Sequence, residues 1–467
     1  MQVSFGSRAT AQSGSTASSA NLFGISLIAA LAGFIFGFDT VVISGANLPI
    51  KELWHTSRLF HGFFIMSMAL WGTVVGALLG GLPAQKYGRK KVLLWIGIFF
   101  SISALGSALA NGPYVFSFFR FIGGLGIGVS SVAAPTYVSE ISTPSTRGRL
   151  VAMYQFNIVF GILIAFLSNY FLQGVGGPND WRWMLGVMAI PSLIYTLMVF
   201  GIPESPRWLV AVKRDNTAAR RVMERLGMNN IDDEIQMITA SATHEAHAGH
   251  DNHHFFSKKY SSIIWLAFFV AFFNQWSGIN FILYYAPEIL SRAGLAAKES
   301  LLNSIAIGGT NLLFTFLGLY LIDRLGRKTL LIIGSIGYII SLAMVAWCFY
   351  AHASAGLLMV FLLLFIAAHA IGQGAVIWVF ISEIFPNRVR AMGQSFGASV
   401  HWVFAALITL ITPVFLDKDD GIFKDNPWPI FGFFAFMMAL QLIWVLSKVP
   451  ETKGVSLEDL ERKLVKE

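Results

Sequence analysis

The chain has 467 residues, of which 55% are hydrophobic, 12% are charged and 41 are phenylalanine. This composition excludes an ordinary soluble globular protein, whose charged fraction is about twice as high. The single cysteine, Cys348, excludes a disulfide framework and a metal site built from cysteines. The net charge of +8 suits a nucleic-acid or a membrane partner, and its distribution along the chain decides between them.

Residues 1–20 are rich in Ser, Ala, Thr and Gly, which predicts a disordered N-terminal tail and not a cleaved signal peptide. Apolar stretches follow, each long enough to cross about 30 Å of hydrocarbon as a helix. The predicted spans are 22–45, 60–81, 91–110, 113–135, 150–173, 184–202, 261–290, 301–322, 329–349, 357–382, 391–416 and 428–447. The sequence therefore predicts an all-α membrane protein with twelve transmembrane helices.

A polar segment, with prolines at 203 and 206 and many basic residues, separates the first six spans from the last six. The motifs of the first set recur in the second at nearly the same offset. The first set carries KYGRKK at 86–91 and YVSE at 137–140, and the second carries DRLGRK at 323–328 and ISEI at 381–384. This recurrence indicates a duplication. We expect two pseudo-symmetric six-helix halves, 21–203 and 261–448, a helical linker at 204–260 and a C-terminal tail at 449–467.

Lysine and arginine indicate the orientation of the chain. Most of the 33 lie in the N-terminal tail, the linker, the C-terminal tail and the loops on the same side as these. By the positive-inside rule, both termini and the linker are predicted to be cytoplasmic. The basic surplus then faces the anionic inner leaflet, so the lipid bilayer is the expected partner and nucleic acid is not.

These motifs, with PESPRW at 203–208 and PETKG at 450–454, resemble those of the sugar porters of the major facilitator superfamily over about residues 22–460. The resemblance implies the major facilitator fold and transport of a sugar, in the plasma membrane and as a monomer, without a cofactor or a metal. One departure is Gln85, where the family often has an acidic residue, so that only the second copy keeps an acid, Asp323.

Polar and aromatic side chains inside the spans indicate the substrate site, because polar groups in hydrocarbon need a partner or a cavity. The residues that stand out are Gln155, Gln275, Asn280, Asn311, Trp378 and the pair His401-Trp402. On an uninterrupted helix Gln275 and Asn280 would point about 140° apart. We therefore expect the seventh span to be broken near Gly278.

Amides that donate and accept hydrogen bonds, together with flat indole faces, suit a monosaccharide. The resemblance implies sugar contacts at the same positions, including Trp402, and adds Phe36 as an aromatic wall. Two departures weaken this transfer. Asn274 stands where relatives often have a second glutamine, and Ala375 replaces the usual proline after Gly374. The alternative is that the amides pair with each other between helices.

Asp39 lies deep in the first span, and Arg120 in the fourth is the one lysine or arginine in the interior of any predicted span. A lone carboxylate there is costly, so we expect Arg120 to pair with Asp39 and the pair to couple proton and sugar. The resemblance supports this role, because the family's proton symporters carry an aspartate at this position. The alternative is a static ion pair.

At the cytoplasmic face the family pattern places acidic residues at span ends beside arginines. We expect interhelical ion pairs there that hold the two halves together when the protein opens outward. The residues assigned to these pairs are Arg89, Glu140, Asp323, Arg327 and Glu383.

Histidines raise two weaker possibilities. The run from His244 to His254 suggests a metal site, although a solvated loop is the favoured interpretation. His369 and His401 lie inside spans, where hydrogen-bonded structural histidines are favoured over titrating ones. No hydrolase, phosphate-loop or metal-spaced motif is present, so an enzyme is not expected. The sequence predicts a proton-coupled importer of a pentose or hexose, with a proton-independent facilitator or a non-transporting sugar receptor as alternatives.

Overall fold

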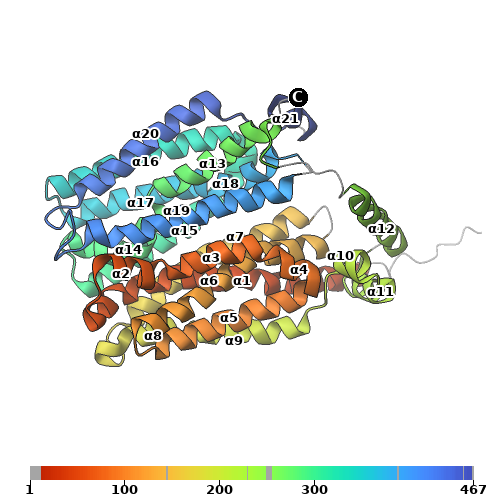
Figure 1. The fold of residues 1–467 in the computed structure, drawn as a ribbon, viewed down its shortest axis with the longest axis horizontal. Helices are drawn as coiled ribbons and strands as arrows, with labels where there is room; N and C mark the ends of the chain where they lie inside the picture. The colour runs from red at the N-terminus through yellow and green to blue at the C-terminus, as the bar shows by residue number, and fades with distance from the viewer. Residues whose placement is uncertain are drawn as a thin grey trace, which may run out of the picture.

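The structure is a computed structural model that describes residues 12–142, 146–228, 230–248, 255–386, 389–455 and 457–464. The described residues form helices joined by short turns, without a strand. The helices make two bundles that lie against each other, the lower one in Figure 1 from the first part of the chain and the upper one from the second. This arrangement confirms the predicted all-α fold with two halves.

The N-terminal half consists of one helical bundle. Its elements are α1 (Gln12–Trp54), α2 (Arg58–Phe60), η1 (His61–Met66), α3 (Met68–Leu79), α4 (Gly81–Tyr87), α5 (Arg89–Leu109), α6 (Pro113–Ile141), α7 (Arg147–Leu172), η2 (Gly177–Asn179), α8 (Asp180–Gly186) and α9 (Ala189–Gly201). The linker follows, with α10 (Pro206–Trp208), η3 (Leu209–Lys213), α11 (Asn216–Arg225), α12 (Ile231–Ala248) and η4 (Lys258–Tyr260).

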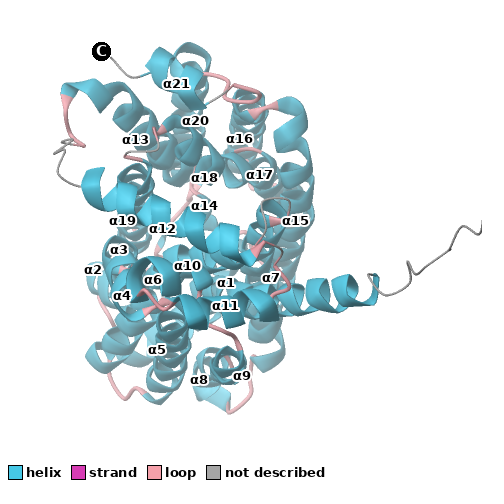
Figure 2. Cartoon of the chain, turned by 90° about the vertical axis from the view of Figure 1, so that its right-hand side faces the viewer, coloured by secondary structure: helices cyan, strands magenta, loops and turns pink. Residues whose placement is uncertain are grey.

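The C-terminal half repeats the bundle and ends in a short additional helix. Its elements are α13 (Ser261–Trp276), α14 (Ile279–Arg292), α15 (Ala297–Leu325), α16 (Arg327–Tyr350), α17 (Ala355–Ile371), α18 (Gln373–Ile384), α19 (Arg390–Leu416), α20 (Trp428–Lys448) and α21 (Leu457–Leu464). Helices α10, α11, α12 and α21 lie at one end of the molecule, which we call the linker end (Figures 1 and 2). The opposite end, where α2 and α8 lie, is the far end.

Within the described ranges, eleven helices are long and apolar enough to cross a membrane. A bent pair, Arg58–Met66 and Met68–Leu79, makes twelve if it counts as one span, with a bend of 45°. The bend lies at Ser67, directly after the π-helix η1. At η1, Gly62 approaches α19 so closely that a Cβ would overlap the carbonyl oxygen of Leu410. The irregular turn therefore accommodates contact between the halves, which spacing alone does not reveal.

Glycines allow other helix backbones to touch, as small residues do in membrane proteins. A Cβ on Gly37 would overlap the carbonyl oxygen of Ile158, where α1 meets α7. A Cβ on Gly124 would likewise overlap that of Ala69, where α6 meets α3. These contacts hold the helices of the N-terminal half at close spacing. They place α1, with its single acidic residue in the predicted span, firmly inside the bundle.

The N-terminal segment differs partly from the prediction, whereas the linker agrees with it. The helix α1 begins at Gln12, so residues 12–20 continue a helix where a disordered tail is predicted. Asn21 donates a hydrogen bond of 2.9 Å to the carbonyl of Arg225, which places this part of α1 at the linker end. The linker is helical, as predicted, and its helix α11 carries several of its basic residues.

Candidate functional site

The seventh span is broken where the sequence predicts it. Helix α13 ends at Trp276 and α14 begins at Ile279, with Gly278 between them at a φ of +86°. A residue with a side chain rarely adopts this conformation. A Cβ on Gly278 would also lie 2.8 Å from the ring of Phe434. Glycine is therefore needed here, and the break redirects the side chains on either side of it.

The break brings Gln275 and Asn280 together. Asn280 Nδ2 donates a hydrogen bond of 2.8 Å to Gln275 Oε1. Gln275 Nε2 in turn donates to Asn274 Oδ1 at 2.9 Å and lies 3.1 Å from Nε2 of His401 on α19. All four side chains are buried. This is the amide pairing that the alternative interpretation expects, but the donors and acceptors concerned can equally serve a hydroxyl-rich ligand.

Aromatic rings surround this amide cluster and connect the two halves. The His401 ring lies 5.0 Å from that of Trp378 and 4.7 Å from that of Trp402, measured between centroids. Trp402 also lies 5.6 Å from Phe36 of α1. The structure therefore brings five of the predicted substrate residues into one connected group, from Gln275 and Asn280 to Phe36.

Gln155 and Asn311 lie elsewhere in the same interface. They are on α7 and α15, which pack against each other across the two halves, with Phe156 and Phe316 in ring contact at 5.2 Å. Gln155 is partly exposed and Asn311 is 5% exposed. Among the described residues neither side chain has a hydrogen-bond partner, and none of the ring or hydrogen-bond contacts joins either to Gln275. Their amides are free to take a ligand.

Asp39 and Arg120 form the predicted ion pair. Arg120 Nη1 donates to Asp39 Oδ1 at 2.5 Å, and Arg120 Nη2 donates to the Asp39 carbonyl at 3.2 Å. Both residues are almost completely buried, at 0% and 1% exposure. The second carboxylate oxygen, Oδ2, has no hydrogen-bond partner within the described part of the chain. One oxygen of this carboxylate is thus paired with a cation, and the other is buried without a hydrogen-bond partner among the described residues.

Tyr284 connects this pair to the broken helix. It lies on α14 in the other half, is fully buried, and is within electrostatic reach of both Arg120 and Asp39. Thr40 of α1 is its side-chain neighbour there, although no hydrogen bond of normal geometry forms between them. A helix that carries Asn280 therefore also carries a polar group beside the buried carboxylate.

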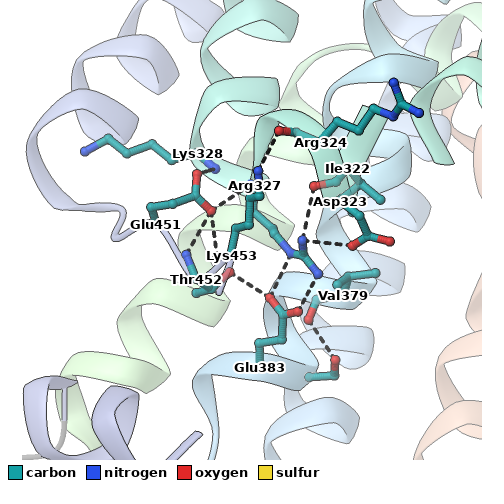
Figure 3. Close-up of polar contacts among 11 residues, drawn as sticks. Ile322, Asp323, Arg324, Arg327, Lys328, Val379, Glu383, Glu451, Thr452 and Lys453 are labelled. Atoms are coloured by element: carbon teal, nitrogen blue, oxygen red, sulfur yellow. Dashed lines mark hydrogen bonds and ion pairs between the residues drawn. The ribbon is translucent and has the colours of Figure 1, made fainter. Parts of the chain in front are cut away.

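Ion pairs form at the linker end, one in each half. Arg89 donates from Nε and Nη2 to the two carboxylate oxygens of Glu140, at 2.9 and 2.8 Å. Arg327 makes the same two-pronged contact with Glu383, at 3.0 and 2.7 Å (Figure 3). Asp323 adds a contact of 3.2 Å to Arg327, and its side chain is 80% exposed. The first copy has no such acid, in agreement with Gln85.

These pairs differ from the expectation in where they lie. Arg89 and Glu140 belong to α5 and α6, both in the N-terminal half, whereas Arg327 and Glu383 belong to α16 and α18, both in the C-terminal half. In this conformation they therefore fasten helices within a half and do not join the halves. Their predicted role in holding the halves together when the protein opens outward stays a prediction.

Two glutamates that sequence reasoning missed complete these clusters. Glu204 accepts hydrogen bonds from the backbone N–H groups of Arg89 and Lys90, at 2.8 and 3.0 Å. Glu451 accepts from those of Arg327 and Lys328, at 2.9 and 3.0 Å (Figure 3). Each carboxylate thus caps the N-terminus of a long helix, where the helix dipole favours a negative charge.

The two capping glutamates lie in the family motifs PESPRW and PETKG, and these motifs are the signal in the sequence that marks them as important. What spacing could not show is that each motif folds back onto a helix more than a hundred residues earlier in the chain. Thr452 adds a hydrogen bond of 2.7 Å from its hydroxyl to Glu383. We call each arrangement a clasp, the first centred on Glu204 and the second on Glu451.

At the far end polar contacts do join the halves. Asn47 Nδ2 donates to Glu288 Oε2 at 2.7 Å, linking α1 to α14. Lys51 pairs with Asp417, and Arg58 Nε lies 3.0 Å from Asp420 Oδ2. Sequence reasoning missed Glu288 although it is an acidic residue inside a predicted span, which is in itself a signal of function.

The histidine predictions have separate outcomes. His369 Nδ1 lies 2.6 Å from the Tyr338 hydroxyl, and His401 lies against Gln275, so both rings have hydrogen-bond partners. No group of metal-binding side chains is found among the described residues. The proposed metal run falls largely outside them, at 250–254, and the side chains of His244 and His247 are likewise not described.

Comparison with known proteins agrees with this geometry. The family described as "Sugar (and other) transporter" matches residues 25–464. The arabinose-proton symporter of Bacillus subtilis is 33% identical over 448 residues, covering 95% of each chain. The D-xylose-proton symporter of Escherichia coli K12 is 31% identical over 482 residues, covering 95% of this chain and 96% of the relative.

Solved structures show the same relationship. The partially occluded inward-open form of the E. coli xylose transporter XylE has a TM-score of 0.82 at 30% identity, covering 94% of this chain and 100% of the other. XylE bound to 6-bromo-6-deoxy-D-glucose has a TM-score of 0.78 at 31% identity, covering 96% and 99%. The chain is thus a multi-pass membrane transporter for sugar and not an enzyme. It belongs to the sugar porter family of the major facilitator superfamily.

Proposed function

We propose that this protein imports a monosaccharide, a pentose or a hexose, by proton symport with alternating access. The observation that carries the proposal is the buried pair of Asp39 and Arg120 inside the N-terminal half, with Arg120 Nη1 at 2.5 Å from Asp39 Oδ1 and Tyr284 of the other half within electrostatic reach. Burying a carboxylate at this depth costs free energy, so its presence favours a functional role. The symporter relatives support both parts of the proposal.

The proposed sugar site is built around the break in the seventh span. Gln275 and Asn280 supply donors and acceptors for ring hydroxyls. Trp378, Trp402 and Phe36 supply flat apolar faces for the sugar's C–H groups. Binding replaces the amide–amide bonds with bonds to hydroxyls, so the cluster loses no hydrogen bond when the sugar enters. Gln155 and Asn311 complete the site from α7 and α15.

Asp39 is the proposed proton carrier. In the present conformation Arg120 favours its charged form. In another state of the cycle α1 and α6 shift within the N-terminal half, so that Arg120 moves away. Burial then favours the neutral form, and the carboxyl takes a proton from outside. The neutral carboxyl no longer opposes closure around the sugar, so both cross together. A static ion pair, in contrast, would stay intact through the cycle.

We propose that the linker end faces the cytoplasm and that the structure shows an inward-facing state. The first point rests on the distribution of lysine and arginine. The second rests on the polar contacts that close the far end and on the similarity to the partially occluded inward-open form of XylE, with a TM-score of 0.82. The proposed location is the plasma membrane, with both termini cytoplasmic and the monomer as the functional unit.

The test uses the purified protein in proteoliposomes. With a proton gradient imposed, wild-type protein should accumulate the sugar uphill, and Asp39→Asn should lose accumulation while keeping sugar exchange at equal concentrations. The matched control is Glu52→Gln, which removes an exposed carboxylate from the same helix and should leave accumulation unchanged. If wild-type sugar transport is independent of the proton gradient, the protein is a facilitator.

The substrate site is tested separately. A counterflow assay against radiolabelled pentoses, hexoses and polyols identifies the sugar. Gln155→Ala and Gln275→Ala should each abolish most counterflow, with unchanged amounts of folded protein in the membrane. Full transport by both variants would remove the assigned site. Sugar binding without any counterflow by wild-type protein would indicate a receptor.

A further inference from the structure

A chain of hydrogen bonds crosses from one half to the other at the far end. The Thr56 hydroxyl lies 2.8 Å from His61 Nδ1, and His61 Nε2 lies 2.7 Å from Asn47 Oδ1. The other end of the Asn47 amide donates to Glu288 at 2.7 Å. Three of these residues are in the N-terminal half, on α1, η1 and the turn between α1 and α2, and Glu288 is on α14 in the C-terminal half.

The chain is arranged so that the Asn47 amide has one orientation. His61 occupies its oxygen, which leaves the NH₂ group directed at Glu288. Asn47 is 2% exposed and His61 is 1% exposed, so water cannot readily replace either bond. His61 therefore acts as a positioning residue. It holds the amide in the orientation that makes the contact between the halves.

Glu288 has no cation within ion-pair distance among the described residues, and the Asn47 amide is its one side-chain hydrogen-bond donor there. Lys51 is nearby but pairs with Asp417. The hydrogen bond from Asn47 is made only when the two halves are in contact at the far end. It therefore stabilises the conformation in which the far end is closed. If the halves separate at the far end, that contact is lost.

Glu288 also lies on the helix that carries the proposed sugar site. Asn280 and Glu288 are eight positions apart on α14, or about two helical turns. A non-helical residue, Tyr285, and Pro287 lie between them, so the helix can bend there. A bend there would move Glu288 relative to Asn47 and so break the contact between the halves.

We infer that Asn47 and Glu288 form a latch that holds the far end closed, with His61 positioning the latch. This inference rests on the proposed function in that it assumes alternating access. Opening the far end requires the Asn47–Glu288 bond to break. The latch is separate from the proposed sugar and proton sites, because neither residue contacts Gln275 or Asp39 in the described structure.

The experiment measures the conformation of the far end directly. In a Cys348→Ala background, which removes the single native cysteine, spin labels are placed at Asn111→Cys and Ala351→Cys. Both positions are exposed at the far end, one in each half. Electron–electron distance measurements on the full chain in nanodiscs then give the ratio of far-end-open to far-end-closed molecules without sugar or a proton gradient.

Glu288→Ala should raise the open-to-closed ratio about tenfold, as expected for the loss of one hydrogen bond to a charged group. Glu288→Gln keeps an oxygen that can accept from Asn47 and should change the ratio by less than about twofold. Glu52→Ala, at the same end of the molecule but exposed, is the matched control and should leave the ratio unchanged.

A double-mutant cycle tests the partnership itself. Asn47→Ala should shift the ratio as Glu288→Ala does, and the two together should shift it no further, because they remove the same bond. An unchanged ratio in Glu288→Ala, or shifts of the two variants that multiply, would overturn the latch. Since the measurement needs neither sugar nor protons, failure of the latch is distinguishable from failure of symport, which the proteoliposome assay reports.

Discussion

Removing the Glu451 carboxylate should weaken the second clasp. Four backbone N–H groups donate to this side chain, those of Arg327, Lys328, Thr452 and Lys453, at 2.9 to 3.0 Å. The first two are the opening residues of α16, which have no acceptor inside the helix. Glu451→Ala leaves all four groups to water and removes a negative charge from the positive end of the helix dipole.

The size of the effect follows from the contacts. Two capped helix N–H groups contribute about 1 kcal/mol each, and the charge–dipole interaction adds about 0.3–1 kcal/mol. The remaining two bonds involve a surface turn and contribute less. A loss of about 2–3 kcal/mol is expected. If the C-terminal half melts as one unit of roughly 190 residues, this lowers its melting temperature by about 4–12 °C.

The chain provides its own reporter for the measurement. Cys348 is the single cysteine, is 1% exposed and lies on α16, the helix that Glu451 caps. A fluorogenic thiol reagent added to the detergent-solubilised protein during heating therefore reports when α16 loses its packing. Unfolding of membrane proteins is often irreversible, so variants are compared at one heating rate.

Controls separate the cap from a general effect of lost charge. Glu461→Ala removes an exposed carboxylate from α21 and should not change the melting temperature. Glu451→Gln keeps an acceptor oxygen without the charge and should fall between Glu451→Ala and wild type. If Glu451→Ala has the same melting temperature as Glu461→Ala, the proposed stabilisation by the clasp is wrong.

Further variants test other parts of the structure. Gly278→Ala forces a side chain into a positive φ and against Phe434, and should reduce counterflow at least about tenfold with normal expression; counterflow near the wild-type rate would show that the break is not needed. Trp402→Ala removes a ring between Phe36 and His401 and should weaken sugar binding about tenfold, measured by titration of tryptophan fluorescence; an unchanged affinity would place the sugar elsewhere. Glu383→Gln should favour the inward-open state, seen as faster labelling of an engineered cysteine at the linker end, and unchanged labelling would count against a gating role.

Features set by local chemistry could be predicted from the sequence. The spans follow from long apolar runs, because backbone groups in hydrocarbon must be satisfied within a helix. The break at Gly278 follows from two polar side chains that an ideal helix would point apart. The pair of Asp39 and Arg120 follows from the cost of isolated charges in the membrane, since each is the natural partner of the other.

Features that depend on distant contacts could not be predicted in this way. Nothing near Glu204 indicates that it caps a helix beginning at Arg89. Span ends alone do not show which neighbour an arginine reaches, so the sequence does not reveal that the ion pairs lie within each half. The bend at Ser67 depends on the approach of Gly62 to α19. Glu288 is different, because its place in an apolar run is visible in the sequence.

The two clasps have a consequence for how the protein is made. Each lies directly after the sixth helix of its half and fastens that end of the chain to the start of the third. The first half can therefore close its own bundle while the second is still on the ribosome, and neither closure needs the other half. Two separately translated polypeptides, divided within the linker, should accordingly assemble in the membrane into a working transporter.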